Sequence, residues 1–445
     1  MIVALLLACV GPEAGPAGVT GGVQEAPPTG QAAPPSTPTH VEACGGDNGW
    51  SQAEGTLPVS WCARVSPELG SITNEEEDPG AIGPHVGTLA PTAGSTAAAP
   101  PCGVENLVGA LGLGGTAAAP AVLYCDQDKE GGVRFATYNP AFERIASTFV
   151  AKGDCSAVPG SGTLTALGEG WIVSWAGTTL ANDVDVGGAS GTYGIVAARL
   201  DASGSTVAGP VRVEVGEDIG HVDLAIGAYP LAVAVTWSGA VWLAPVPLGA
   251  DPTLAAPAPQ RLTSGAAEAA IVATGAGFTV ATCADADGQL TLWQLDAVGA
   301  VLGSAPVAGA TCGWSQRPSL VATAGGVVLG WTGPTSAGVA ALGADLAEAW
   351  RYTPPGGATQ VAALDDGVLV VTRDGTVSRL DESGVVVASA VHPALVDAEG
   401  SIGDLRLVVS GLDALFLTYG MSNYPTGGGH VDTFDYVEIS AAPLP

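Results

Sequence analysis

The chain has 445 residues, of which 47% are hydrophobic and 13% are charged, so it is long enough to bury a large core. Its 43 acidic residues outnumber 13 basic ones, which gives a formal net charge of −30. A field of this sign repels phosphate backbones and anionic lipid headgroups, and it argues against nucleic acid as a partner. Cationic ligands, metal ions and neutral polymers are accommodated more easily.

The first residues indicate an export signal. Residues 2–8 form an apolar run that is too short to span a bilayer. The run ends in Leu6-Leu7-Ala8-Cys9, which resembles a bacterial lipobox. The resemblance implies a signal peptide over residues 1–8, cleavage before Cys9 and acylation of Cys9. No Lys or Arg precedes the run, so a start upstream of Met1 and a chance apolar N-terminus stay open. Val10 rather than Asp follows Cys9, which by the same resemblance implies the outer membrane, at the cell surface or in the periplasm.

Residues 9–38 have the composition of a tether. They consist mainly of Gly, Pro, Ala and Thr, with Pro-rich stretches at 26–30 and 33–38. Such a segment buries too little apolar surface to offset its ordering entropy. Because Pro-rich chain extends by about 3 Å per residue, the tether can hold a domain tens of Å from a membrane.

Residues 39–445 carry an internal repeat, which returns about every 40–60 residues. Its first landmark is a strand that closes on an aromatic residue, seen at 173–177, 235–239 and 329–333. Its second is a Leu-Asp-x-x-Gly hairpin turn, seen at 200–204, 295–299 and 380–384. In such a turn we expect the Asp to cap the backbone and the Gly to adopt a positive φ.

Alignment on the closing residue gives eight units. The position is held by Trp61, Tyr124, Trp175, Trp237, Thr282, Trp331, Thr372 and Tyr419, and the units begin near Cys44, Cys102, Cys155, Gly220, Ala267, Gly313, Ala358 and Ser401. One unit is predicted to form strands at 270–274, 278–283, 290–295 and 301–308. Repeated four-stranded units predict an all-β β-propeller with eight blades, or seven as the alternative. The repeats resemble those of exported bacterial β-propeller proteins over about residues 39–445.

The last unit predicts how the ring closes. Residues 435–440 read as its third strand, and a fourth strand is expected from residues 39–43. An N-terminal strand in the C-terminal blade would remove two exposed sheet edges.

Six cysteines fall at fixed positions in the repeat. Three follow the closing residue and three begin the next unit, which predicts the disulfides Cys62–Cys102, Cys125–Cys155 and Cys283–Cys312 between adjacent blades. The alternative is a metal site, but no Cys-x-x-Cys occurs. Disulfides need an oxidising compartment, in agreement with export. Cys44 is either free or paired with a non-acylated Cys9.

The loops after the second strands are the candidate binding face, because function concentrates on loops of a rigid scaffold. They are long and acidic, and the candidate residues are Glu75, Glu76, Glu77, Asp78, Asp126, Asp128, Glu130, Asp183, Asp185, Asp285, Asp287, Asn423, Tyr424 and His430. The pairs Asp126 with Asp128, Asp183 with Asp185, and Asp285 with Asp287 are weak Ca²⁺ candidates, since Asp-x-Asp can present hard oxygens. Ordinary hairpin chemistry explains the same residues.

The ten tryptophans have two interpretations. Trp175, Trp237 and Trp331 share one repeat position and are expected to pack between blades, whereas Trp50, Trp242, Trp293, Trp314 and Trp350 lie off that register and are candidates for exposed stacking platforms.

The sequence favours binding over catalysis. It contains no Gly-x-Ser-x-Gly, Walker or His-Glu-x-x-His motif, and its five histidines are isolated. We therefore predict a monomeric, non-enzymatic lipoprotein that binds a protein or glycan, touches a membrane through its lipid anchor only and needs no cofactor apart from the weak Ca²⁺ sites. The alternative is a carbohydrate-active hydrolase or lyase that uses paired carboxylates from different blades.

Overall fold

All secondary-structure elements described in the computed structural model are β-strands, and they form eight sheets. Side chains are described for most of residues 111–390 and for 407–409; the gaps are 117, 126–131, 139–144, 154, 156–160, 179–192, 249–257, 313–315, 335, 358–359 and 373. The strands outside these ranges are described by their backbone. The predicted all-β class is confirmed.

Six sheets are four-stranded antiparallel meanders, named here blades 1 to 6 in chain order. Blade 1 contains β5 (Ala110–Thr116), β6 (Ala119–Asp126), β7 (Gly132–Tyr138) and β8 (Arg144–Lys152). Blade 2 contains β9 (Gly162–Leu167), β10 (Gly170–Gly177), β11 (Gly194–Leu200) and β12 (Thr206–Val213). Blade 3 contains β13 (Ile219–Ile226), β14 (Pro230–Thr236), β15 (Ala240–Pro245) and β16 (Gln260–Ser264).

The second half of the chain continues the pattern. Blade 4 contains β17 (Ala266–Thr274), β18 (Gly277–Ala284), β19 (Gln289–Leu295) and β20 (Val301–Thr311). Blade 5 contains β21 (Ser319–Thr323), β22 (Gly326–Thr332), β23 (Ala337–Gly343) and β24 (Glu348–Tyr352). Blade 6 contains β25 (Ala358–Leu364), β26 (Gly367–Thr372), β27 (Thr376–Asp381) and β28 (Val386–Val391). Blade 7 contains β29 (Ile402–Ser410), β30 (Asp413–Thr426), β31 (His430–Pro443) and β4 (Pro84–Thr88).

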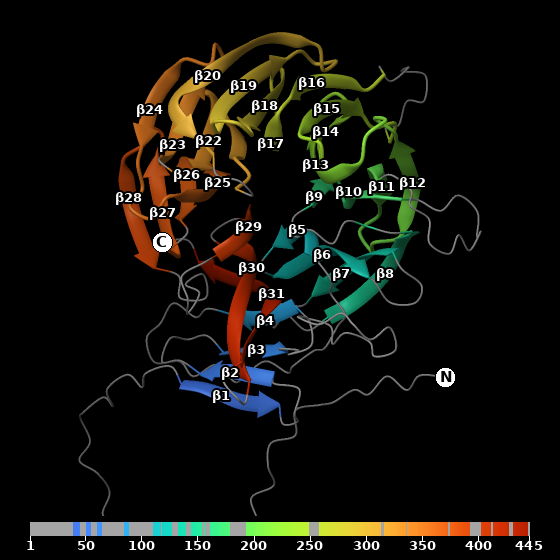
Figure 1. The fold of residues 1–445 in the computed structure, drawn as a ribbon, viewed down its shortest axis with the longest axis vertical. Helices are drawn as coiled ribbons and strands as arrows, with labels where there is room; N and C mark the ends of the chain where they lie inside the picture. The colour runs from blue at the N-terminus through green and yellow to red at the C-terminus, as the bar shows by residue number, and fades with distance from the viewer. Residues whose placement is uncertain are drawn as a thin grey trace, which may run out of the picture.

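The first strands of blades 1 to 7 contact one another in a closed cycle, β5-β9-β13-β17-β21-β25-β29-β5, around which the blades radiate (Figure 1). The fold is a β-propeller, and this cycle matches the seven-blade alternative. The unit predicted near Cys44 instead supplies a separate three-stranded sheet of β1 (Thr39–Cys44), β2 (Trp50–Glu54) and β3 (Ser60–Arg64).

The last blade is completed by an N-terminal strand, but by a different segment from the one predicted. β4 pairs in parallel with β31, from Pro84 opposite Val437 to Thr88 opposite Ala441. The predicted segment, residues 39–43, lies in β1 and pairs antiparallel with β2. β1 and β2 are close in sequence, so their pairing costs little loop-closure entropy. β4 is not part of that sheet, and it pairs with β31 instead.

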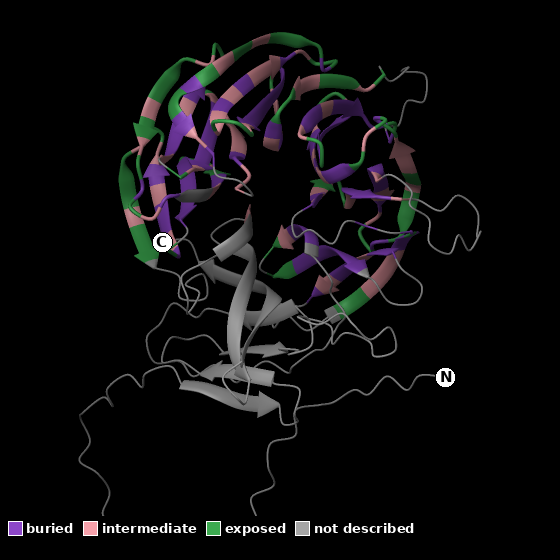
Figure 2. Cartoon of the chain, in the orientation of Figure 1, coloured by how far each residue is buried: buried purple, intermediate pink, exposed green. Residues whose placement is uncertain are grey.

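Burial follows the position of a strand in its blade (Figure 2). Every residue of β14, the second strand of blade 3, is buried, because neighbouring blades cover both faces of the sheet. By contrast, β20 on the rim of blade 4 is mostly exposed or half-buried. In blades 3 and 4 the inner strands therefore form the buried part that carries the loops.

The Leu-Asp-x-x-Gly hairpins have the predicted turn chemistry. In each of them Oδ1 of the Asp accepts hydrogen bonds from backbone N–H groups two and four residues later, for Asp201 from Ser203 (2.8 Å) and Ser205 (2.9 Å). The glycines have φ of +83° (Gly204), +80° (Gly299) and +81° (Gly384).

The structure adds a second reason for these glycines. A Cβ on Gly204 would lie 2.3 Å from the ring of Phe135, and one on Gly384 would lie 2.6 Å from the ring of Trp350. In both cases the aromatic residue belongs to the preceding blade. Trp350 also donates a hydrogen bond from Nε1 to the carbonyl of Glu382 at 2.8 Å. Trp350 is therefore an inter-blade packing residue and not the exposed platform that its off-register position suggested.

We expect Gly384→Ala to lower the free energy of unfolding by about 2–4 kcal/mol, because strain from positive φ adds to overpacking against Trp350. Gly216 is the matched control, since its φ is +81° and nothing lies within 4 Å of a Cβ there. Gly216→Ala should lose only about 1–2 kcal/mol from the φ term. Denaturant unfolding of both variants measures the difference, and equal losses would contradict a packing role for Trp350.

Candidate functional site

The face of the ring at which second strands end and first strands begin is called here the loop face. Its described connections from second to third strands are residues 237–239 in blade 3, 285–288 in blade 4 and parts of 333–336 and 373–375 in blades 5 and 6. Of the predicted loop candidates, Asp285 and Asp287 lie on this face with described side chains.

These two aspartates shape a short turn. Both are exposed. Asp287 accepts the backbone N–H of Gln289 at 2.9 Å, and the N–H of Asp285 binds the carbonyl of Gly265 at 2.7 Å. The described residues contain no group of three or more His, Cys, Asp or Glu suited to a metal ion. The side chains of Glu75, Glu76, Glu77, Asp78, Asp126, Asp128, Glu130, Asp183 and Asp185 lie outside the described residues, so calcium binding by those loops stays a prediction.

The last candidate loop is largely a hairpin. Asn423 and Tyr424 lie in β30 and His430 lies in β31, with Tyr424 opposite Asp432 and Thr426 opposite His430. The paired region extends past Gly420, where the pairing of β30 with β29 ends. The sequence interpretation of 421–432 as a loop was wrong, because β30 continues to Thr426 and β31 begins at His430, and the two strands are paired over these residues. On the loop face, the backbone of this hairpin extends beyond the start of β29, the first strand of blade 7.

Trp237 is the main exception among the aligned aromatic residues. Trp175 and Trp331 are 1% and 2% exposed, and each packs in the core shared with the preceding blade, as predicted. Trp237 is 63% exposed. β14 ends at Thr236, and a tight turn follows in which the N–H of Gly239 binds the carbonyl of Thr236 at 2.9 Å. Thr236, which is 3% exposed, occupies the buried position, and a slip of one residue moves Trp237 out of the core.

The indole of Trp237 forms a platform with one supported face. Three of its ring atoms lie 3.4–3.6 Å from where a Cβ on Gly220 would be, so the ring lies against the backbone of that glycine. Gly220 sits at a β-bulge between Ile219 and His221. The backbone N–H of Trp237 also binds the carbonyl of Asp218 at 3.0 Å. The platform is therefore fixed from two sides.

Two carboxylates adjoin this platform. Glu217 accepts hydrogen bonds on Oε2 from Ser238 and, at 3.3 Å, from Thr236. The hydrogen bond from Ser238 is the main cause that lowers the pKa of Glu217, against the opposing effect of burial, so the group is ionised at neutral pH. Asp218 is exposed and accepts the N–H of Tyr193 on Oδ1 at 2.6 Å. The site is thus an exposed aromatic ring with neighbouring negative charge.

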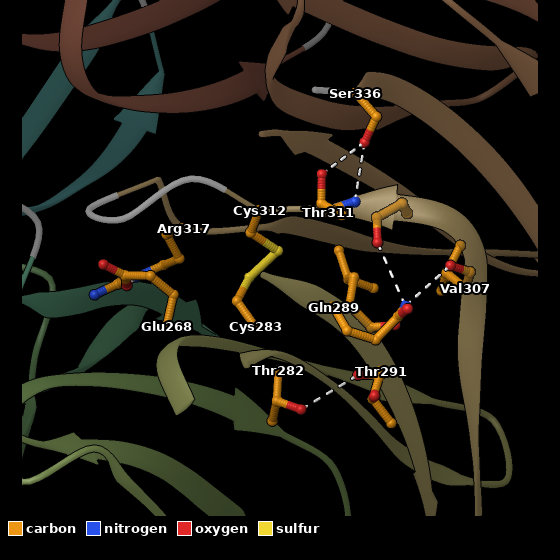
Figure 3. Close-up of a disulfide and its surroundings, with 12 residues drawn as sticks. Glu268, Thr282, Cys283, Gln289, Thr291, Val307, Thr311, Cys312, Arg317 and Ser336 are labelled. Atoms are coloured by element: carbon orange, nitrogen blue, oxygen red, sulfur yellow. Dashed lines mark hydrogen bonds and ion pairs between the residues drawn. A yellow bond between two sulfur atoms is a disulfide. The ribbon is translucent and has the colours of Figure 1, made fainter. Parts of the chain in front are cut away.

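A buried charge cluster lies next to the platform, at the start of three consecutive first strands. Nε2 of His221 in β13 is 3.2 Å from Oε2 of Glu268 in β17, and Nε of Arg317, just before β21, is 4.0 Å from the same oxygen. The three side chains are 12%, 13% and 6% exposed. Figure 3 shows Glu268 and Arg317 beside the Cys283–Cys312 disulfide. The cluster connects blades 3, 4 and 5 under the loop face, so His221 is a packed residue.

Two predicted disulfides are confirmed. Cys125–Cys155 has a Cα–Cα distance of 5.8 Å and Cys283–Cys312 one of 5.7 Å. Each joins the end of a second strand to the connection that leads to the next blade. Cys155 forms a β-bridge to Gly177 of that next blade, and the N–H of Thr311 binds Oγ of Ser336 at 3.0 Å. The side chains of Cys9, Cys44, Cys62 and Cys102 lie outside the described residues.

The other off-register tryptophans that the structure describes are packed in the same way as Trp350. Trp242 and Trp293 are half-buried against inter-blade cores, so they are packing residues rather than platforms. The side chains of Trp50 and Trp314 lie outside the described residues. Among the described tryptophans, the exposed one is therefore Trp237, at a repeat position where the sequence predicted packing.

A groove of about 670 Å³ lies on the opposite face, between the turns of blade 2. Glu169, Arg199, Asp201 and Val207 are among its lining residues. A hydrogen bond from Ser203, followed in effect by one from Ser205, holds the pKa of Asp201 below its ordinary value. The carboxylate therefore stabilises the turn in which it lies. None of the residues that line the groove is aromatic.

In the part of the chain that the structure describes, no helix has the length and apolar character needed to cross a membrane.

No protein-family model matches the chain, and no curated protein matches it. Solved structures with a similar fold include BamB from Moraxella catarrhalis, with 13% identity, a TM-score of 0.38 and coverage of 86% of this chain and 96% of that one. Sqt1 from Saccharomyces cerevisiae has 11% identity, a TM-score of 0.38 and coverage of 74% and 95%. The computationally designed Ika8 protein has 13% identity, a TM-score of 0.40 and coverage of 73% and 96%. Likeness at this level does not indicate what the chain binds.

Proposed function

We propose that this chain is a non-enzymatic binding protein of the cell envelope, which binds a protein or a glycan through its loop face. The exposed indole of Trp237 carries the proposal. Large aromatic side chains that stay in water on a rigid support are typical anchors of interfaces. Gly220 and the blade 3 turn supply that support, so little side-chain entropy is lost on binding.

The acids near the platform favour binding over hydrolysis. A glycosidase needs two carboxylates about 5–10 Å apart that can act on a substrate between them. Glu217 accepts a hydrogen bond from Ser238 of blade 3, and Asp218 accepts one from Tyr193 of blade 2. Glu268 is paired with His221 and Arg317. These acids therefore have structural partners that a catalytic pair would have to give up.

In this proposal the envelope location comes from the N-terminal segments. Residues 1–8 are the signal peptide, Cys9 carries the lipid, residues 9–38 are the tether and residues 39–445 form the binding domain. The protein acts as a monomer that is held on the outer membrane, at the cell surface or in the periplasm. The two disulfides support an oxidising compartment.

The location is tested by labelling cells with an alkyne-bearing fatty acid. The wild-type protein should incorporate the label and sediment with membranes, whereas Cys9→Ser should do neither. Equal labelling of the two proteins would contradict lipidation at Cys9.

The binding role is tested with the immobilised full chain, probed with a glycan array and with envelope proteins. Asp285→Cys and Glu169→Cys place a reactive thiol on the loop face and on the opposite face. Coupling a polyethylene glycol maleimide to residue 285 should block capture of the retained ligand, and coupling to residue 169 should not. Release of sugars from the array during incubation would replace this proposal with the hydrolase or lyase.

A further inference from the structure

The surroundings of Trp237 allow the ligand class to be narrowed. We infer that the loop face binds a basic segment of a partner protein, with a Lys or Arg side chain stacked on Trp237 and neutralised by Asp218 and Glu217. This inference rests on the proposed function and specifies its partner.

The geometry of the indole suits a cation. Gly220 lies against the ring, and Trp237 as a whole residue is 63% exposed, so the other ring face is open to a ligand. Lys ammonium and Arg guanidinium groups bind over an indole face within about 6 Å of its centre. An Arg guanidinium is also flat and can stack on the ring.

The charges beside the ring point to the same ligand. Among the described hydrogen bonds, that of Tyr193 reaches Oδ1 of Asp218, and the second oxygen of this exposed carboxylate is open to a donor. Two basic residues lie close by. Arg212 is paired with Glu214 at 2.9 Å, and the positive charge of Arg261 adds to the effect of the Ser238 hydrogen bond in lowering the pKa of Glu217. Asp285 and Asp287 are exposed on the adjacent blade 4. This part of the loop face is therefore negative around an aromatic ring.

The net charge of the whole chain also favours a basic partner over a glycan. With a net charge of −30, the protein attracts basic segments from a distance and accelerates their encounter. A neutral glycan gains nothing from that field. Sugar hydroxyls also need donors as well as acceptors, and the groups adjoining the ring are mainly carboxylate acceptors.

The test uses the full chain and a fluorescein-labelled peptide of six Gly-Arg repeats, with six Gly-Ser repeats as the neutral peptide. Fluorescence anisotropy measures Kd for the wild type, Trp237→Ala, Trp237→Phe, Asp218→Asn and Glu169→Gln. We expect Trp237→Ala to raise Kd by about threefold to thirtyfold, and Trp237→Phe by less. Asp218→Asn should weaken binding more than Glu169→Gln, which removes the same charge on the opposite face.

Several outcomes would overturn the inference. Equal effects of Trp237→Ala and Glu169→Gln would reduce the interaction to overall charge. A glycan that is retained by the wild type and lost with Trp237→Ala would identify the other ligand class. If the wild type and Trp237→Ala capture an envelope protein equally well, the proposed function stands but Trp237 has no part in it. If the wild type captures no ligand at all, the proposed function is wrong. Unchanged melting temperatures establish that the variants are folded.

Discussion

Glu268→Gln is expected to lower the free energy of unfolding by about 3 kcal/mol, which is a large share of the stability of a typical domain. The change keeps the size of the side chain and removes its charge. Arg317, which is 6% exposed, then remains buried beside a neutral group. Because removal of one member of a buried pair leaves an uncompensated charge, the loss exceeds that for a surface pair. Denaturant unfolding at neutral pH measures it.

Glu348→Gln is the matched control, because Glu348 pairs with Arg351 at an exposed site. There the same chemical change should lose at most about 1 kcal/mol. Adding Arg317→Met to Glu268→Gln should recover part of the stability, since the stranded cation is removed. If the two glutamine variants lose the same amount, the cluster does not stabilise the ring.

Replacing Cys283 and Cys312 together with serine is expected to lower stability by about 3–4 kcal/mol in the chain-entropy account. The bond closes a loop with a sequence separation of 29, and Cys125–Cys155 closes one of 30, so the two double replacements should have similar effects. Both fasten a second strand to the connection that enters the next blade, far enough apart to act independently. Equilibrium unfolding of each double variant measures the losses.

The wild type provides the control for this experiment. Reductant should destabilise it by more than either double replacement, because it breaks both bonds. Peptide mapping without reduction should recover both linked pairs and would show whether Cys62 joins Cys102. Identical unfolding with and without reductant would contradict a stabilising role for these bonds.

Features with a local cause could be predicted from the sequence. The hairpin aspartates bind N–H groups within four residues, so their motif is complete in one short segment. The two disulfides were predictable because their cysteines recur at the same two places in the repeat. Trp237 could not be placed, since an alignment by residue type does not detect a slip of one residue, and that slip reverses which side of the sheet a side chain faces.

Features that depend on contacts between units were missed. His221, Glu268 and Arg317 are isolated in the sequence, yet each lies within a few residues of a predicted unit start, and that shared position was a usable signal. The aromatic residues that pack over Gly204 and Gly384 come from preceding blades and have no fixed spacing from them. Ring closure was assigned to the wrong strand because the edge of β31 accepts any extended segment that can reach it.

The pairing of β4 with β31 also sets the order of events during biogenesis. A ribosome makes residues 84–88 early and residues 430–443 late, and the two segments share one sheet. Blades 1 to 6 are each built from consecutive residues and can form as they emerge. The final sheet must wait until β31 has left the ribosome, so the circle is sealed after blades 1 to 6 have emerged.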